Sequence, residues 1–68
     1  MLPPSSQKVV DYWWPVVKAY AEIQLKKGLT LHNFIVAMEG YMETKTFLVR
    51  ERKEMMKKVM QFATDQNV

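Results

Sequence analysis

Two cations, Lys45 and Arg52, are the residues of this chain best placed to bind a charged group, because both interrupt an otherwise apolar pattern. That pattern is a doublet repeated every seven residues, at Phe34/Ile35, Tyr41/Met42, Leu48/Val49, Met55/Met56 and Phe62/Ala63. With the first member of each doublet at heptad position d, the a positions are Leu31, Met38, Lys45, Arg52 and Val59. Lys45 and Arg52 therefore interrupt an otherwise apolar seam at two consecutive a positions. Their stems could pack while their charged groups reach water, they could set the register of paired helices, or they could bind an acidic partner. A cation–π contact between Lys45 and Trp13 is also open.

The positive charge of the chain is concentrated around these two residues. The net charge is +3, and six of the ten Lys and Arg residues lie between 45 and 58, opposed there only by Glu51 and Glu54. Such a run is either a solvated helix face or a surface for an acidic protein or a phosphate backbone. The candidate nucleic-acid-binding residues are therefore Lys45, Arg50, Arg52, Lys53, Lys57 and Lys58.

Patterns that carry catalysis or hold cofactors are missing from the sequence. It has no glycine-rich phosphate loop and no cysteine, and a single histidine, His32, cannot form a metal site by itself. No acidic residue falls in the apolar stripe, where its pKa would be raised. We therefore expect no enzymatic activity, no metal and no cofactor.

Several large apolar residues are candidates for a partner surface. Trp14 lies about 100° around a helix from Trp13, off the main apolar seam, so it is either the edge of a wide core or an interface anchor. Six methionines is a high number for 68 residues, and methionine suits irregular cores as well as adaptable interfaces. The residues that we predict to bind a partner are Trp14, Lys45, Arg52, Met55, Met56, Val59, Met60 and Phe62.

The elements that position these residues are predicted to be helices. Two prolines near the start predict an extended arm over 1–5, and Ser5 or Ser6 would cap a helix over 6–27. We expect this helix to be kinked near Pro15. Its apolar seam consists of Val9, Trp13, Val16, Tyr20 and Ile23.

A turn at 28–30 leads to a second helical segment over 31–65. Gly28 can adopt the left-handed conformation that ends a helix, and Thr30 is a good cap for the next one. The unbroken heptad register favours one long helix, whereas weak helix formers at 43–46 would allow a break and hence three helices.

The two predicted helices differ in length. At roughly 1.5 Å per residue, they would be about 33 Å and about 52 Å long, so a hairpin would leave apolar side chains beyond Arg52 uncovered. Such a strip requires a third helix or a second chain. The sequence thus predicts a single all-α domain over 1–68, either a helical hairpin with a long second helix or a three-helix bundle, paired into a dimer.

The function that these features favour is protein binding without catalysis. We expect a regulator or adaptor that binds itself and another protein, in the cytoplasm, because no signal peptide or membrane-spanning stretch is recognisable. The alternative is a DNA-binding regulator with a helix-turn-helix-like segment over 15–42 and a basic helix over 45–58. The residues that such a segment would present to the major groove are His32, Asn33, Val36 and Glu39. None of them is Arg or Lys, the residues that usually read guanine.

Overall fold

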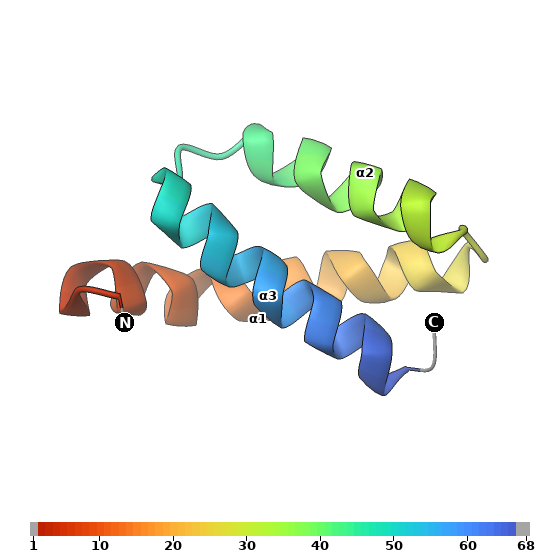
Figure 1. The fold of residues 1–68 in the computed structure, drawn as a ribbon, viewed down its shortest axis with the longest axis horizontal. Helices are drawn as coiled ribbons and strands as arrows, with labels where there is room; N and C mark the ends of the chain where they lie inside the picture. The colour runs from red at the N-terminus through yellow and green to blue at the C-terminus, as the bar shows by residue number, and fades with distance from the viewer. Residues whose placement is uncertain (1, 67–68) are drawn as a thin grey trace.

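Three helices and no strand make up the part of the chain that this computed structural model describes, residues 2–66. The helices are α1 (Pro4–Lys26), α2 (Leu31–Glu43) and α3 (Val49–Asp65). α3 crosses α1 obliquely and makes the most extensive contact with it, whereas α2 and α3 diverge from their connection and touch least (Figure 1). The all-α prediction is confirmed, and the three-helix form is the one observed.

The single long helix that the sequence favoured over 31–65 does not form. Residues 44–48 separate α2 from α3, so the weak helix formers at 43–46 do mark a break. Folding α3 back onto α1 buries Met55 and Val59 completely. The free energy gained by burying this apolar surface offsets the loss of the helical hydrogen bonds at the break. The heptad register of 31–65 reflects only the residues of that segment, so it does not include the gain from contact with α1.

Side chains satisfy the backbone groups on both sides of the break. The Thr44 hydroxyl donates a hydrogen bond of 2.6 Å to the carbonyl of Tyr41. On the other side, the carboxylate of Glu51 accepts a 2.9 Å hydrogen bond from the backbone N–H of Leu48, as in half of a capping box. Glu51 is only 5% exposed, so an acidic residue does lie on the buried side of α3.

The first helix begins earlier than predicted. α1 starts at Pro4 with Pro3 in the N-cap position, so the extended arm is shorter than 1–5 and neither Ser5 nor Ser6 caps the helix through its side chain. Proline is suited to a first turn because the N–H that it lacks would have no helical partner there. Further along, α1 continues through Pro15 as one helix.

The turn between α1 and α2 has the chemistry that the sequence predicts. Gly28 has a φ of 73°, in the left-handed region, and ends the first helix as expected. The Thr30 hydroxyl oxygen accepts a 3.2 Å hydrogen bond from the backbone N–H of Asn33. Both predictions at this turn are therefore confirmed.

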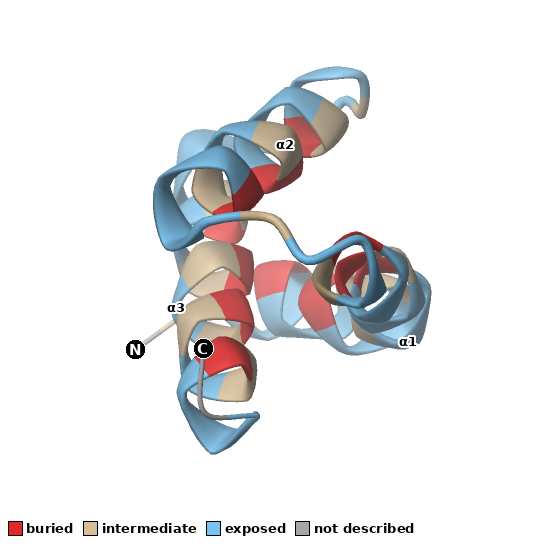
Figure 2. Cartoon of the chain, turned by 90° about the vertical axis from the view of Figure 1, so that its right-hand side faces the viewer, coloured by how far each residue is buried: buried red, intermediate tan, exposed pale blue. Residues whose placement is uncertain are grey.

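The core lies where the three helices meet, and Figure 2 shows its buried residues on the sides that face one another. Its fully buried apolar residues are Val10, Val17, Ala21, Phe34, Met38, Met42, Met55, Val59 and Ala63.

The buried face of α1 is rotated relative to the predicted seam. Val10, Val17 and Ala21 are fully buried, while the seam residues Val16 and Ile23 are 45% and 53% exposed. The cause is the third helix: α1 is covered by α2 on one side and by α3 on the other, so its buried face is centred between them. A hairpin partner alone would have covered the seam itself.

Candidate functional site

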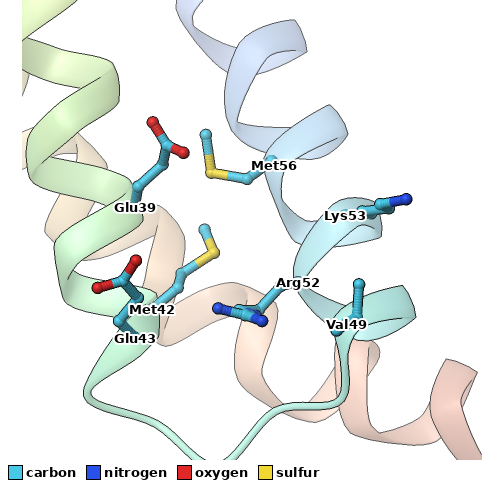
Figure 3. A pocket seen from close by; sticks show the side chains of 7 residues that line it. All are labelled: Glu39, Met42, Glu43, Val49, Arg52, Lys53 and Met56. Carbon is cyan, nitrogen blue, oxygen red and sulfur yellow. The ribbon is translucent and has the colours of Figure 1, made fainter.

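The diverging helices α2 and α3 leave a groove of about 230 Å³ between them (Figure 3). Met42 and Met56 extend toward it from opposite walls. On each helix the lining residues recur after three or four positions, with Met42/Glu43 and Arg52/Lys53 as adjacent pairs, which places them on one broad face. Three come from α2 and four from α3: Glu39, Met42, Glu43, Val49, Arg52, Lys53 and Met56.

Arg52 supplies the unsatisfied polar group of this groove. Its Nε is buried from solvent and has no hydrogen-bond partner, and Figure 3 shows the guanidinium directed toward α2. Leaving a buried donor unpaired costs about 1–3 kcal/mol. Such a group in a folded protein therefore needs an explanation.

The acidic residues of the opposite wall do not pair with Arg52. Glu39 and Glu43 are exposed on α2, and within residues 2–66 the ion pair closer than 4.0 Å is the one between Lys57 and Glu54, at 3.9 Å on the surface of α3. The groove thus has carboxylates on one wall, a guanidinium on the other and thioethers between them. This arrangement can hold an apolar side chain beside a hydrogen-bond acceptor.

Lys45, the second cation of the heptad pattern, is not part of this groove. It lies in the connection between α2 and α3, where its Nζ is 5.7 Å from the ring centre of Trp13 and 4.9 Å from that of Tyr41. The predicted cation–π contact with Trp13 is therefore confirmed. Because Lys45 is outside the helices, it occupies no heptad position in the folded chain.

Two other predicted partner-binding residues, Trp14 and Phe62, lie on the opposite side of α3, against α1, where they line one hollow. The Nζ of Lys58 lies 5.6 Å from the Trp14 ring, and the Nζ of Lys18 lies 5.7 Å from the Phe62 ring. Trp14 and Phe62 are half-buried and pack against the core. Trp14 is therefore at the edge of a wide core, which was one of its two predicted roles.

Met55 and Val59 have a different place from the predicted partner surface. Both are completely buried in the core, because α1 covers the strip that a hairpin would have left bare. Neither side chain therefore has exposed surface with which to contact a partner, contrary to the prediction. Met60 is half-buried on α3.

The cations of the basic segment are dispersed by the fold. Arg50, Lys53 and Lys57 are exposed and, at spacings of three and four, share one face of α3. Arg50 is held there by a 2.9 Å hydrogen bond from its Nε to the hydroxyl oxygen of Ser6, a serine that is only 1% exposed. No sequence pattern indicated this contact, since the two residues are far apart in the chain.

The residues of the helix-turn-helix alternative are all at the surface. His32, Asn33, Val36 and Glu39 are exposed on α2, and Glu39 also belongs to the groove with Arg52. The turn that precedes α2 has the expected geometry. This element therefore has an accessible face but carries no cation on it.

Over the range 2–66, no cluster of three or more His, Asp or Glu side chains is arranged to hold a metal ion. None of the three helices combines the length and the apolar character needed to cross a lipid bilayer. Comparison of the chain with protein-family models, with curated proteins and with solved structures finds no match.

Proposed function

We propose that this protein is a protein-interaction module that binds a segment of another protein in the groove between α2 and α3. The observation that carries the proposal is the groove itself, whose lining includes two apolar side chains that a ligand can reach, the half-buried Met56 and the exposed Val49. Methionine side chains are flexible and polarisable, so they can fit the side chains of a docked segment.

The size and chemistry of the groove favour a protein partner over a small molecule. Small-molecule pockets usually have volumes of about 300–1,000 Å³, whereas this groove has about 230 Å³, room for one or two side chains. Its apolar floor is flanked by Glu39 and Glu43 on one wall and by Arg52 on the other. An apolar centre with a charged rim is the usual composition of a protein–protein interface.

Peptide display tests this function with a matched pair of variants. Val49 lines the groove and is 58% exposed, whereas Val36 lies outside the groove and is 54% exposed. Because both side chains are largely in solvent, Val49→Glu and Val36→Glu should fold like the natural chain. Peptides selected on the natural chain should bind Val49→Glu at least about tenfold more weakly, because an apolar contact is lost and a charge is desolvated. They should bind Val36→Glu as tightly as the natural chain.

Failure to select any peptide would contradict the proposal. Equal binding to both variants would contradict it too, because the binding surface would then lie outside the groove.

A second candidate function, nucleic-acid binding, is supported by the exposed face of α3. Arg50, Lys53 and Lys57 lie together there and can reach solvent. Binding through them would be electrostatic, so log affinity for duplex DNA should fall with log salt by about 0.9 for each phosphate neutralised. Lys53→Glu with Lys57→Glu should weaken it, and His32→Ala with Asn33→Ala should not. Loss of binding in the second pair would instead favour the helix-turn-helix alternative.

A further inference from the structure

We infer that the outer face of α1 binds the same face of a second copy of this chain, with the two helices antiparallel and Lys8 of each copy beside Glu22 of the other. This surface does not overlap the groove between α2 and α3, so its partner does not depend on the proposed function.

The outer face of α1 carries an unbroken row of apolar side chains, which we call the α1 seam. Figure 2 shows this side of the helix turned away from α2 and α3. The residues of the α1 seam follow one another at alternating spacings of three and four: Val9, Tyr12, Val16, Ala19 and Ile23. Val9 is half-buried and the others are exposed.

The spacing of the α1 seam is that of a helix that pairs with another helix. Alternating steps of three and four average 3.5 residues, the repeat with which paired helices keep one face in contact. Val9, Val16 and Ile23 share one position of this repeat and are β-branched. Their side chains are therefore stiff and lose little freedom when a second helix covers them.

The α1 seam is complementary to itself when a two-fold axis perpendicular to α1 relates the two copies. In such a pair, residue i meets residue j while j meets i. A register that places Tyr12 against Val16 of the second copy also places Val9 against Ala19, because both pairs are centred on the same point of the helix. A larger side chain then meets a smaller one at each of these contacts.

The charges beside the α1 seam fit this antiparallel register. Lys8 and Glu22 are exposed, and each directly precedes a residue of the seam, so both flank the same edge of it. Within residues 2–66, neither has an ion-pair partner closer than 4.0 Å. Lys8 of each copy then lies beside Glu22 of the other, which gives two contacts between opposite charges. A parallel pair would instead set Lys26, which continues the seam, against Lys26 of the second copy.

The second copy is held weakly. Exposed ion pairs contribute little, and the α1 seam is small beside the roughly 800 Å² per partner of stable complexes. We therefore expect a dissociation constant on the order of hundreds of micromolar. The paired charges would lie within the Debye length of about 8 Å at physiological salt, so salt screens them less than the repulsion between two chains of net charge +3.

Charge reversal tests the antiparallel register. Lys8→Glu and Glu22→Lys each turn both contacts into like-charge pairs, whereas a one-to-one mixture of the two variants restores opposite charges at both. The mixed pair should therefore be about threefold or more tighter than either variant with itself. Titration of ¹⁵N-labelled Lys8→Glu with unlabelled Glu22→Lys, followed by NMR, measures the mixed affinity, and dilution of each variant measures the others.

Lys57→Glu is the matched control for Lys8→Glu, because it gives the chain the same net charge through an exposed residue of α3. Mixed with Glu22→Lys, it leaves one contact between opposite charges and one between two lysines. It should therefore bind Glu22→Lys about threefold more weakly than Lys8→Glu does.

Cross-linking gives a second readout of helix direction. The chain has no cysteine, so each introduced thiol is the sole one. Val9→Cys mixed with Ala19→Cys should form an interchain disulfide at least about tenfold faster than either variant alone, because identical positions lie roughly 15 Å apart along antiparallel helices. In a parallel pair, each variant would instead cross-link with itself.

Three results would overturn the inference. These are the absence of association at millimolar concentration, faster cross-linking of Val9→Cys with itself than with Ala19→Cys, and equal affinity of Lys8→Glu and Lys57→Glu for Glu22→Lys. None of these substitutions lies in the groove between α2 and α3, so each of these results would leave the proposed function unaffected.

Discussion

The environment of a single atom separates the two arginines of α3. Arg50 and Arg52 have the same chemistry, but the Nε of the first donates to Ser6 and the Nε of the second has no partner. Ser6 is buried under Arg50 at the start of α1. Its hydroxyl therefore links the first turn of α1 to the first turn of α3 instead of capping its own helix.

Ser6→Ala should lower the free energy of unfolding by about 1 kcal/mol, the usual net value of one hydrogen bond. Urea unfolding monitored by circular dichroism measures the change. Ser5→Ala is the matched control, because Ser5 is exposed on the same turn and its substitution should change stability by less than about 0.5 kcal/mol. Equal effects of the two substitutions would show that the contact with Arg50 contributes nothing.

At the scale of the elements, short segments decide where each helix ends. Gly28 ends α1 with a positive φ, and Glu51 binds the N–H of Leu48 at the start of α3. Gly40, the second glycine of the chain, lies within α2 and faces open space. The two glycines therefore have opposite effects on stability.

We expect Gly28→Ala to destabilise the protein by about 1 kcal/mol, because an L side chain is strained at a φ of 73°. Gly40→Ala should stabilise it by up to about 1 kcal/mol, since alanine favours the helix and its Cβ meets no atom within 4 Å. Thermal and urea unfolding of both variants checks the opposite signs. Stabilisation by Gly28→Ala would contradict the turn geometry.

At the scale of the whole molecule, the fold covers one apolar strip and leaves another open. α1 covers Met55 and Val59, which belong to the strip from which the sequence predicts a dimer. The open strip runs along α1 itself, where Tyr12, Val16 and Ile23 are 75%, 45% and 53% exposed. The homodimer remains a prediction, and we now expect it to form through this strip of α1.

Light scattering should report a mass that rises from 8.1 kDa toward twice that value as the chain is concentrated. Three side chains form a small patch compared with the roughly 800 Å² per partner of stable complexes, so we expect dissociation constants on the order of hundreds of micromolar. Added salt should strengthen the dimer, because each chain carries a net charge of +3.

Tyr12→Glu should keep the protein monomeric, since a charge would then lie at the centre of the interface. Val36→Glu, an exposed substitution on α2, is the control and should leave the association unchanged. A mass that stays at 8.1 kDa up to millimolar concentration would contradict the dimer prediction.

The sequence by itself determined the features that depend on neighbouring residues. Helical periodicity identified the apolar faces that α2 and α3 bury, including Phe34, Met42 and Met55. Gly28 and Thr30 predicted the turn, because left-handed backbone and capping are properties of a few adjacent residues. The contact between Glu51 and the N–H of Leu48 is local too, but Leu48 lacks the side-chain oxygen of a capping box, so the sequence does not mark this helix start.

Only the tertiary structure decided the features that depend on distant residues. A helix over 31–65 and a break within it have similar local free energies, and the apolar surface that α3 buries on α1 makes the difference. The same packing rotates the buried face of α1, brings Ser6 to Arg50 and leaves Arg52 beside an open groove. Each of these features depends on residues that are far apart in the chain and belong to different helices. The periodicity of a single segment therefore cannot predict them.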